Sequence, residues 1–114
     1  MKNLQPQGVW SNFHSLTQIP RPSGKKEEVS AFLADYGRSL GLETIVDSIG
    51  NVIIRKPASP GYENHPGVIL QGHMDMVPQK NNDTVFDFEK DPINAYIDGE
   101  WVTAKGTTLG ADNG

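Results

Sequence analysis

The stretch GHMDMVP, residues 72–78, follows the apolar run VIL at residues 68–70. A short, continuous apolar run bounded by turn residues is typical of a buried strand, and we expect one over residues 67–71. Because side chains alternate along extended backbone, His73 and Asp75 would lie on one face and the neighbouring methionines on the other. Ligands bind at the carboxyl ends of the strands in open α/β sheets, so the sequence predicts a ligand site at His73.

The pair formed by His73 and Asp75 suits a metal site. An imidazole can bind a cation while a carboxylate two residues away orients the ring or neutralises charge. The alternative is a structural histidine that is hydrogen-bonded to a turn carboxylate. So short a pattern recurs by chance, and on its own it favours this structural alternative.

A second stretch, GTTLGADNG at residues 106–114, changes that balance. Its glycines permit positive φ and close approach of the backbone, as either a plain turn or a ligand-binding loop requires. Beside Asp112 we expect a loop shaped around a carboxylate that binds a ligand. A carboxylate is a natural bridge between two metal ions, because each of its oxygens can bind one of them.

Together the two stretches resemble the catalytic-domain motifs of dinuclear zinc peptidases, in particular the aminoacyl-histidine (Xaa-His) dipeptidases, the carnosinase-like peptidase D group of bacteria. The resemblance extends over essentially the whole chain and includes WSNF at residues 10–13, IPRPSG at 19–24 and DSIGNV at 47–52. It implies an α/β fold with a mixed β-sheet flanked by helices. Residues 1–114 would form the N-terminal, incomplete portion of the metallopeptidase catalytic domain.

The resemblance also implies roles for the site residues. His73 and Asp112 would bind zinc, with Asp112 bridging two ions, and Asp75 would support catalysis by contacting a ligand rather than the metal. Manganese or cobalt could replace zinc. The family has a cis peptide after the bridging aspartate. We do not expect it at Asp112-Asn113, because the residues that would enforce it would follow Gly114.

The remaining catalytic groups of the family are expected beyond residue 114. They are an adjacent acidic pair that includes the general base, a further acidic ligand and a distant histidine. A catalytic zinc ion normally has about three protein ligands plus solvent, which His73 and Asp112 cannot supply. We therefore expect an N-terminal fragment of a larger enzyme that has no peptidase activity on its own.

The predicted function is metal-dependent hydrolysis of dipeptides, with Xaa-His as the substrate that the resemblance alone implies. A zinc-bound water with a pKa of roughly 7 would be the nucleophile. Two alternatives stay open: a related tripeptidase or aminopeptidase of the same dinuclear group, and a non-catalytic binding or assembly module. In the second alternative His73 and Asp75 would form a buried hydrogen-bonded pair.

Composition excludes several other classes of protein. The formal net charge is −4 and no lysine–arginine run occurs, so neither nucleic acid nor membrane is an expected partner. The chain has no cysteine, which fits a reducing compartment, and residues 1–8 lack the apolar core of a signal peptide. We expect a cytoplasmic protein whose partner is a small peptide substrate, and a homodimer is one assembly that the resemblance allows.

Two helices are expected in the first third of the chain. Apolar residues at helical spacing predict one over residues 4–19, with Pro6 at its first helical position. Ser23 would be the N-cap of the second helix, and Gly41 would end it in a left-handed conformation.

The remaining segments have the patterns of two β-hairpins and two loops. An Asp-Gly pair between β-rich runs is a strong hairpin signal, and it marks the second hairpin. The expected hairpins comprise residues 43–46 with 51–56 and residues 95–97 with 101–103, and the expected loops are 57–66 and the acidic segment 78–92.

Overall fold

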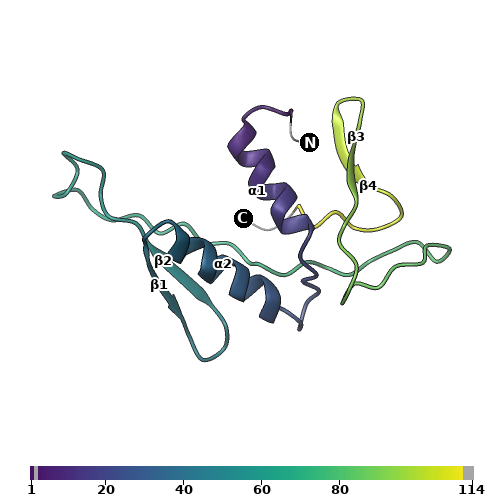
Figure 1. Cartoon of the computed structure of the whole chain (residues 1–114), viewed down its shortest axis with the longest axis horizontal. Coiled ribbons are helices and arrows are strands. Elements are labelled where there is room, and N and C mark those ends of the chain that lie inside the picture. Colours follow the sequence, from purple (N-terminus) through teal and green to yellow (C-terminus); the bar gives the residue numbers. More distant parts are fainter. Residues whose placement is uncertain (2, 112–114) are drawn as a thin grey trace.

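The computed structural model describes residues 1 and 3–111, so the expectations for Asp112 and for the Asp112-Asn113 bond fall outside the described residues. Within that range the chain forms two helices and four strands (Figure 1). In chain order they are α1 (Gln7–Thr17), α2 (Glu27–Ser39), β1 (Glu43–Val46), β2 (Val52–Arg55), β3 (Ala95–Asp98) and β4 (Trp101–Ala104). The predicted α/β class is confirmed. In the described part of the chain the strands form two separate antiparallel pairs rather than one mixed sheet.

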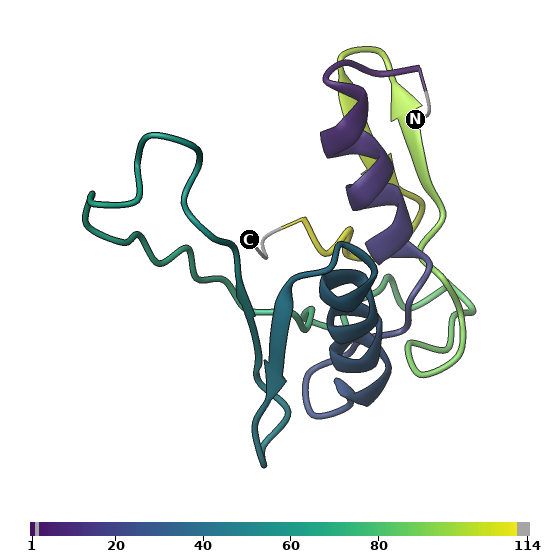
Figure 2. The ribbon, with the colours of Figure 1, turned by 60° about the vertical axis from the view of Figure 1, so that its left-hand side comes forward.

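Helix α1 is shorter than the predicted range of 4–19. Pro6 is the N-cap of the helix, with an extended backbone at ψ 130°, rather than its first helical residue. At the other end Thr17 is buried, and its carbonyl oxygen accepts a hydrogen bond from the Ile93 N–H at 2.8 Å. This bond joins the end of α1 to the segment that leads into β3, and α1 lies beside the β3–β4 hairpin in Figures 1 and 2.

Helix α2 begins later than the sequence predicts. Its N-cap is Lys26, so the expectation that Ser23 caps this helix is wrong. The Ser23 N–H instead donates to the Met76 carbonyl oxygen at 3.1 Å, and this strand-like pairing keeps residue 23 out of the helix. Gly41 has a φ of +71°, as predicted for a residue that ends a helix in the left-handed conformation.

Both predicted β-hairpins are present. Strands β1 and β2 pair with Val46 opposite Val52, and strands β3 and β4 pair with Asp98 opposite Trp101. The second hairpin turns at Gly99, whose φ of +60° is the positive value that a two-residue turn requires.

Helix α2 packs against the β1–β2 hairpin through a glycine. A Cβ atom at Gly37 would lie 2.5 Å from Oγ1 of Thr44 and 2.9 Å from Cδ1 of Ile54, so a larger residue would force the two elements apart. Val29 and Ala34 of the same helix are buried. The helix and the hairpin therefore form one packed unit.

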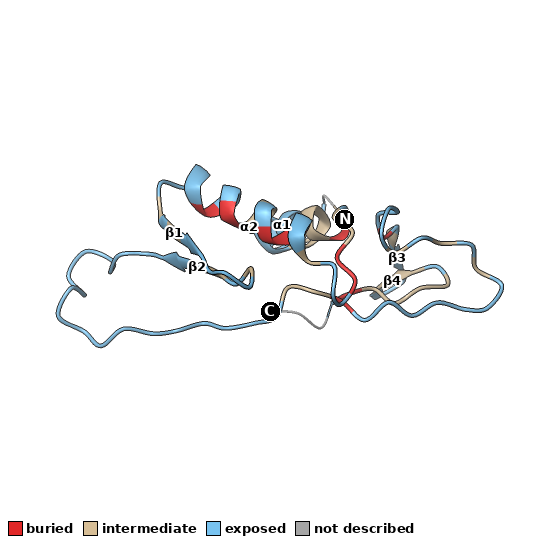
Figure 3. Cartoon of the chain, turned by 90° about the horizontal axis from the view of Figure 1, so that it is seen from below, coloured by how far each residue is buried: buried red, intermediate tan, exposed pale blue. Residues whose placement is uncertain are grey.

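Residues 67–71 do not form the buried strand that their apolar run predicts. Val68, Ile69 and Leu70 are 84%, 92% and 93% exposed, and the ribbon that follows β2 is exposed throughout Figure 3. A buried strand needs neighbouring strands for its backbone hydrogen bonds and a layer of side chains over each face. In the described part of the chain no segment pairs with these residues, so their apolar character alone does not bury them.

The core is small, and one of its members belongs to the candidate site. The radius of gyration is 16.2 Å, against about 13 Å for a compact domain of this length. The buried apolar residues of the described chain are Val29, Ala34, Met76 and Ile93. Neither helix in the described residues has the length and apolar character that crossing a membrane requires.

Candidate metal site

His73 and Asp75 are in contact within the GHMDMVP stretch. Nδ1 of His73 lies 2.9 Å from Oδ1 of Asp75, while Met76 is only 3% exposed. The predicted alternation is confirmed, because the two polar side chains share a face and Met76 points into the core. The side chains of His73 and Asp75 are 48% and 32% exposed, which does not fit the alternative of a buried pair.

The Ser23 hydroxyl, and after it the His73 ring, hold the pKa of the Asp75 carboxyl below its ordinary value. Oγ of Ser23 also lies 3.4 Å from the Met76 carbonyl oxygen, a long contact. The single hydroxyl proton therefore serves the charged carboxylate, which is the stronger acceptor. An ionised carboxylate only accepts hydrogen bonds, so Nδ1 of His73 carries the proton and Nε2 has the lone pair that can bind a metal.

The segment that precedes α2 fixes the backbone of this stretch. The Met76 N–H donates to the Arg21 carbonyl oxygen at 2.9 Å, and the Ser23 N–H donates to the Met76 carbonyl oxygen at 3.1 Å. These bonds make a parallel bridge between Pro22 and Met76. Proline is compatible with this position because neither bond needs its nitrogen as a donor. The extended backbone that places His73 beside Asp75 is thus held by residues outside the stretch.

The loop at residues 106–111 is attached to the end of the GHMDMVP stretch. The Thr108 hydroxyl donates to the Val77 carbonyl oxygen at 2.6 Å. Gly106 and Gly110 have φ values of +75° and +70°, conformations that favour glycine. The loop therefore has the positive φ values and the close approach to another backbone that its glycines predict.

Arg21 is a site residue that no sequence pattern marks. Its side chain is 1% exposed, although it carries a charge. Nη1 donates to the Met74 carbonyl oxygen at 3.4 Å, Nη2 to the Gly110 carbonyl oxygen at 3.0 Å, and Nε to the Leu16 carbonyl oxygen at 3.3 Å. One side chain therefore contacts helix α1, the GHMDMVP stretch and the loop at 106–111.

The donor groups of the described residues fit part of a metal site. Histidines that bind metals commonly donate their other ring N–H to a carboxylate, which fixes the ring and raises its basicity, and His73 has this arrangement. In residues 1 and 3–111 no group of three His, Cys, Asp or Glu side chains could hold an ion. Further ligands would have to come from outside the described residues, where the second predicted ligand, Asp112, lies.

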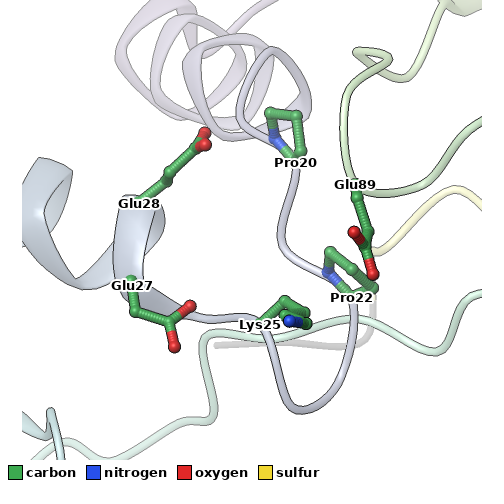
Figure 4. A pocket seen from close by; sticks show the side chains of 6 residues that line it. All are labelled: Pro20, Pro22, Lys25, Glu27, Glu28 and Glu89. Carbon is green, nitrogen blue, oxygen red and sulfur yellow. The ribbon is translucent and has the colours of Figure 1, made fainter.

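A pocket of about 180 Å³ lies elsewhere, where the start of α2 meets the acidic loop (Figure 4). Its lining residues are Pro20, Pro22, Lys25, Glu27, Glu28 and Glu89. One ammonium group among three carboxylates favours neither an anion nor a defined cation. Neither His73 nor Asp75 lines this pocket, so it is not part of the candidate metal site.

Comparison with curated proteins gives a match along the whole chain. The chain is 53% identical over 114 residues to the cytosol non-specific dipeptidase of Escherichia coli K12, of which it covers 24%. Over 63 residues, 55% of this chain, it is 38% identical to a putative LysW-lysine/LysW-ornithine hydrolase of Pyrococcus furiosus, and this match covers 18% of that protein. No protein-family model matches the chain.

Comparison with solved structures shows the same resemblance. The crystal structure of aminoacylhistidine dipeptidase from Vibrio alginolyticus matches 97% of this chain with a TM-score of 0.94 and 52% sequence identity, and the match covers 23% of that protein's chain. The resemblance to aminoacyl-histidine dipeptidases that the motifs predict is therefore confirmed. The chain spans about a quarter of the length of these two dipeptidases.

Proposed function

We propose that the full-length protein containing this chain hydrolyses dipeptides with the help of bound metal ions. The observation that carries the proposal is the 53% identity to a dipeptidase over all 114 residues. The contact between His73 and Asp75 supports it, because a partly exposed imidazole backed by an ionised carboxylate has the arrangement of a metal ligand.

His73 and Asp112 are the proposed ligands of a zinc pair, with manganese or cobalt as alternatives. When bound, zinc supplies an activated water at neutral pH and polarises the peptide carbonyl. The chain's own residues prepare the ligand: Asp75 holds the His73 ring in one orientation and one tautomer, and Ser23 keeps Asp75 ionised. The general base and the remaining ligands would come from other parts of the protein.

Dipeptides with a carboxyl-terminal histidine are the proposed preferred substrates. The name of the Vibrio alginolyticus relative supports this preference, and the name of the Escherichia coli relative supports activity on other dipeptides as well. The latter protein is also described as cytosolic, which supports a cytoplasmic location for this one.

A second candidate function is hydrolysis of a modified lysine or ornithine, as in the name of the Pyrococcus furiosus relative. Its support is 38% identity over 63 residues. The higher identity over the whole chain favours dipeptides. A tripeptidase or aminopeptidase activity, and a non-catalytic binding role, are separated from dipeptide hydrolysis by the choice of substrates and variants below.

The experiment is a hydrolysis assay on the full-length protein with an Xaa-His dipeptide, another dipeptide and a tripeptide. We expect dipeptide turnover that a chelator abolishes and added zinc restores. His73→Ala should abolish turnover, whereas His65→Ala, which replaces an exposed loop histidine, should leave it unchanged.

Each alternative predicts a different result in this assay. Dipeptide turnover that survives the chelator or His73→Ala would exclude metal-dependent hydrolysis at this site. Faster turnover of the tripeptide would identify a tripeptidase, and zinc binding without turnover of any substrate would identify a binding module. The 114-residue chain alone is predicted to be inactive, and turnover above a metal-only control would overturn that prediction.

A further inference from the structure

The side chain of Arg21 contacts both segments that carry the proposed metal ligands. It is 1% exposed and donates to the Met74 carbonyl oxygen at 3.4 Å and to the Gly110 carbonyl oxygen at 3.0 Å. Met74 follows His73 in the sequence, and Gly110 lies two residues before Asp112. One rigid, planar group thus joins two segments that lie far apart in the chain.

The burial of this guanidinium is costly unless hydrogen bonds offset the loss of water. Arg21 has a third contact, from Nε to the Leu16 carbonyl oxygen at 3.3 Å, and its own carbonyl oxygen accepts from the Met76 N–H at 2.9 Å. A planar fork of five donors can hold several backbone segments at fixed angles, which a lysine ammonium cannot reproduce. The geometry of three segments therefore depends on this one side chain.

The contact with Gly110 leaves no room for a side chain. A Cβ atom at Gly110 would lie 2.8 Å from Nη2 of Arg21 and 3.1 Å from Sδ of Met76. Gly110 is itself buried and has a φ of +70°. The backbone at this end of the loop is therefore placed directly against the guanidinium.

We propose that Arg21 is a positioning residue for the metal site: it sets the position of His73 relative to the loop that leads to Asp112, and thereby the affinity for the metal ion. This inference rests on the proposed function, because it takes those two side chains to be metal ligands. Arg21 acts through the backbone of both segments and touches neither metal nor substrate.

The test compares the zinc affinities of full-length variants, measured by competition with a chromogenic chelator. Arg21→Lys keeps the charge and removes the fork. Val29→Ala removes apolar volume from a fully buried position in α2 and controls for a general loss of stability. We expect Arg21→Lys to weaken zinc binding by about 10–100-fold, as replacement of groups that support metal ligands commonly does. Val29→Ala should leave zinc affinity unchanged.

Gly110→Ala provides an independent variant, because it displaces the acceptor of the hydrogen bond instead of the donor. It should also weaken zinc binding. If both changes act through the same contact, the double variant Arg21→Lys/Gly110→Ala will bind zinc little worse than the weaker-binding single variant. Should Arg21→Lys fail to fold, Gly110→Ala carries the test alone, and unchanged zinc affinity in it would overturn the proposal.

Two further results would contradict the positioning role. They are equal zinc affinity in the wild type and Arg21→Lys, and equal losses in Arg21→Lys and Val29→Ala. Fully additive losses in the double variant would show that Arg21 and Gly110 do not act through their contact. Failure of the proposed function is seen separately, as a wild-type protein that binds no zinc or whose zinc affinity is unchanged by His73→Ala.

Discussion

The contact between Gly110 and Arg21 predicts that Gly110→Ala destabilises the protein by about 2–5 kcal/mol, the sum of two terms. The first term is the backbone: at a φ of +70°, a residue with a Cβ costs about 1–2 kcal/mol. The second term is overpacking, because the added Cβ would lie 2.8 Å from Nη2 of Arg21 and 3.1 Å from Sδ of Met76. Overpacking of a well-packed site costs about 1–3 kcal/mol.

Gly41→Ala is the matched control, because Gly41 has a φ of +71° but nothing within 4 Å of the added Cβ. It should cost the backbone term alone, about 1–2 kcal/mol. The assay is denaturant unfolding of the metal-free full-length protein, followed by circular dichroism, for the wild type and both variants. The contact predicts that the loss at Gly110 exceeds the loss at Gly41 by at least about 1 kcal/mol. Equal losses would refute the reasoning, since they would show that Arg21 and Met76 leave room for the methyl group.

Three further predictions concern other parts of the chain. Asp47→Ala should destabilise the protein at neutral pH, because the hydrogen bonds of the Asn51 side chain and backbone, followed by weaker backbone contacts, lower the pKa of Asp47 below 3.8. With the folded-state pKa lowered, the stabilisation is complete above the unfolded value and is lost as the pH falls through the folded value, so unfolding at pH 7 and pH 2 should show a difference from the wild type only at pH 7. Ser23→Ala should raise the pKa of Asp75 toward its ordinary value by removing its main hydrogen bond, and an unchanged carboxyl titration by NMR in the metal-free protein would contradict this. Met76→Ala should cost about 2–5 kcal/mol of unfolding free energy, because Met76 is 3% exposed; a loss near zero in denaturant unfolding would show that its contacts do not stabilise the fold.

Features that depend on a few adjacent residues are predictable from this sequence. The β3–β4 hairpin follows from an Asp-Gly pair between β-rich runs, because glycine favours the positive φ of the turn wherever the turn occurs. Gly41 ends helix α2 for the same local reason. The contact of His73 with Asp75 follows from the alternation of side chains along extended backbone.

Features that depend on distant residues are not predictable in this way. Ser23 has the chemistry of an N-cap, but its N–H pairs with Met76, and no local pattern shows that partner. The apolar run at residues 68–70 has the composition of a buried strand, yet burial depends on what pairs with it and covers it. Arg21 becomes a site residue only through contacts with residues 53 and 89 positions away.

The metal-binding role of Asp112 comes from the family resemblance rather than from local pattern or described geometry. It stays a prediction, since Asp112 lies outside the described residues. His73 is in a different position, because its contact with Asp75 already has the form that metal-ligating histidines adopt.

Anomalous diffraction at the zinc absorption edge, from crystals of the zinc-loaded full-length protein, tests the metal site most directly. The proposed site predicts a zinc peak about 2.0–2.1 Å from Nε2 of His73, with the Asp112 carboxylate bonded to the same ion. If His73 and Asp112 instead face away from each other, with no zinc peak between them, the site proposed here is contradicted.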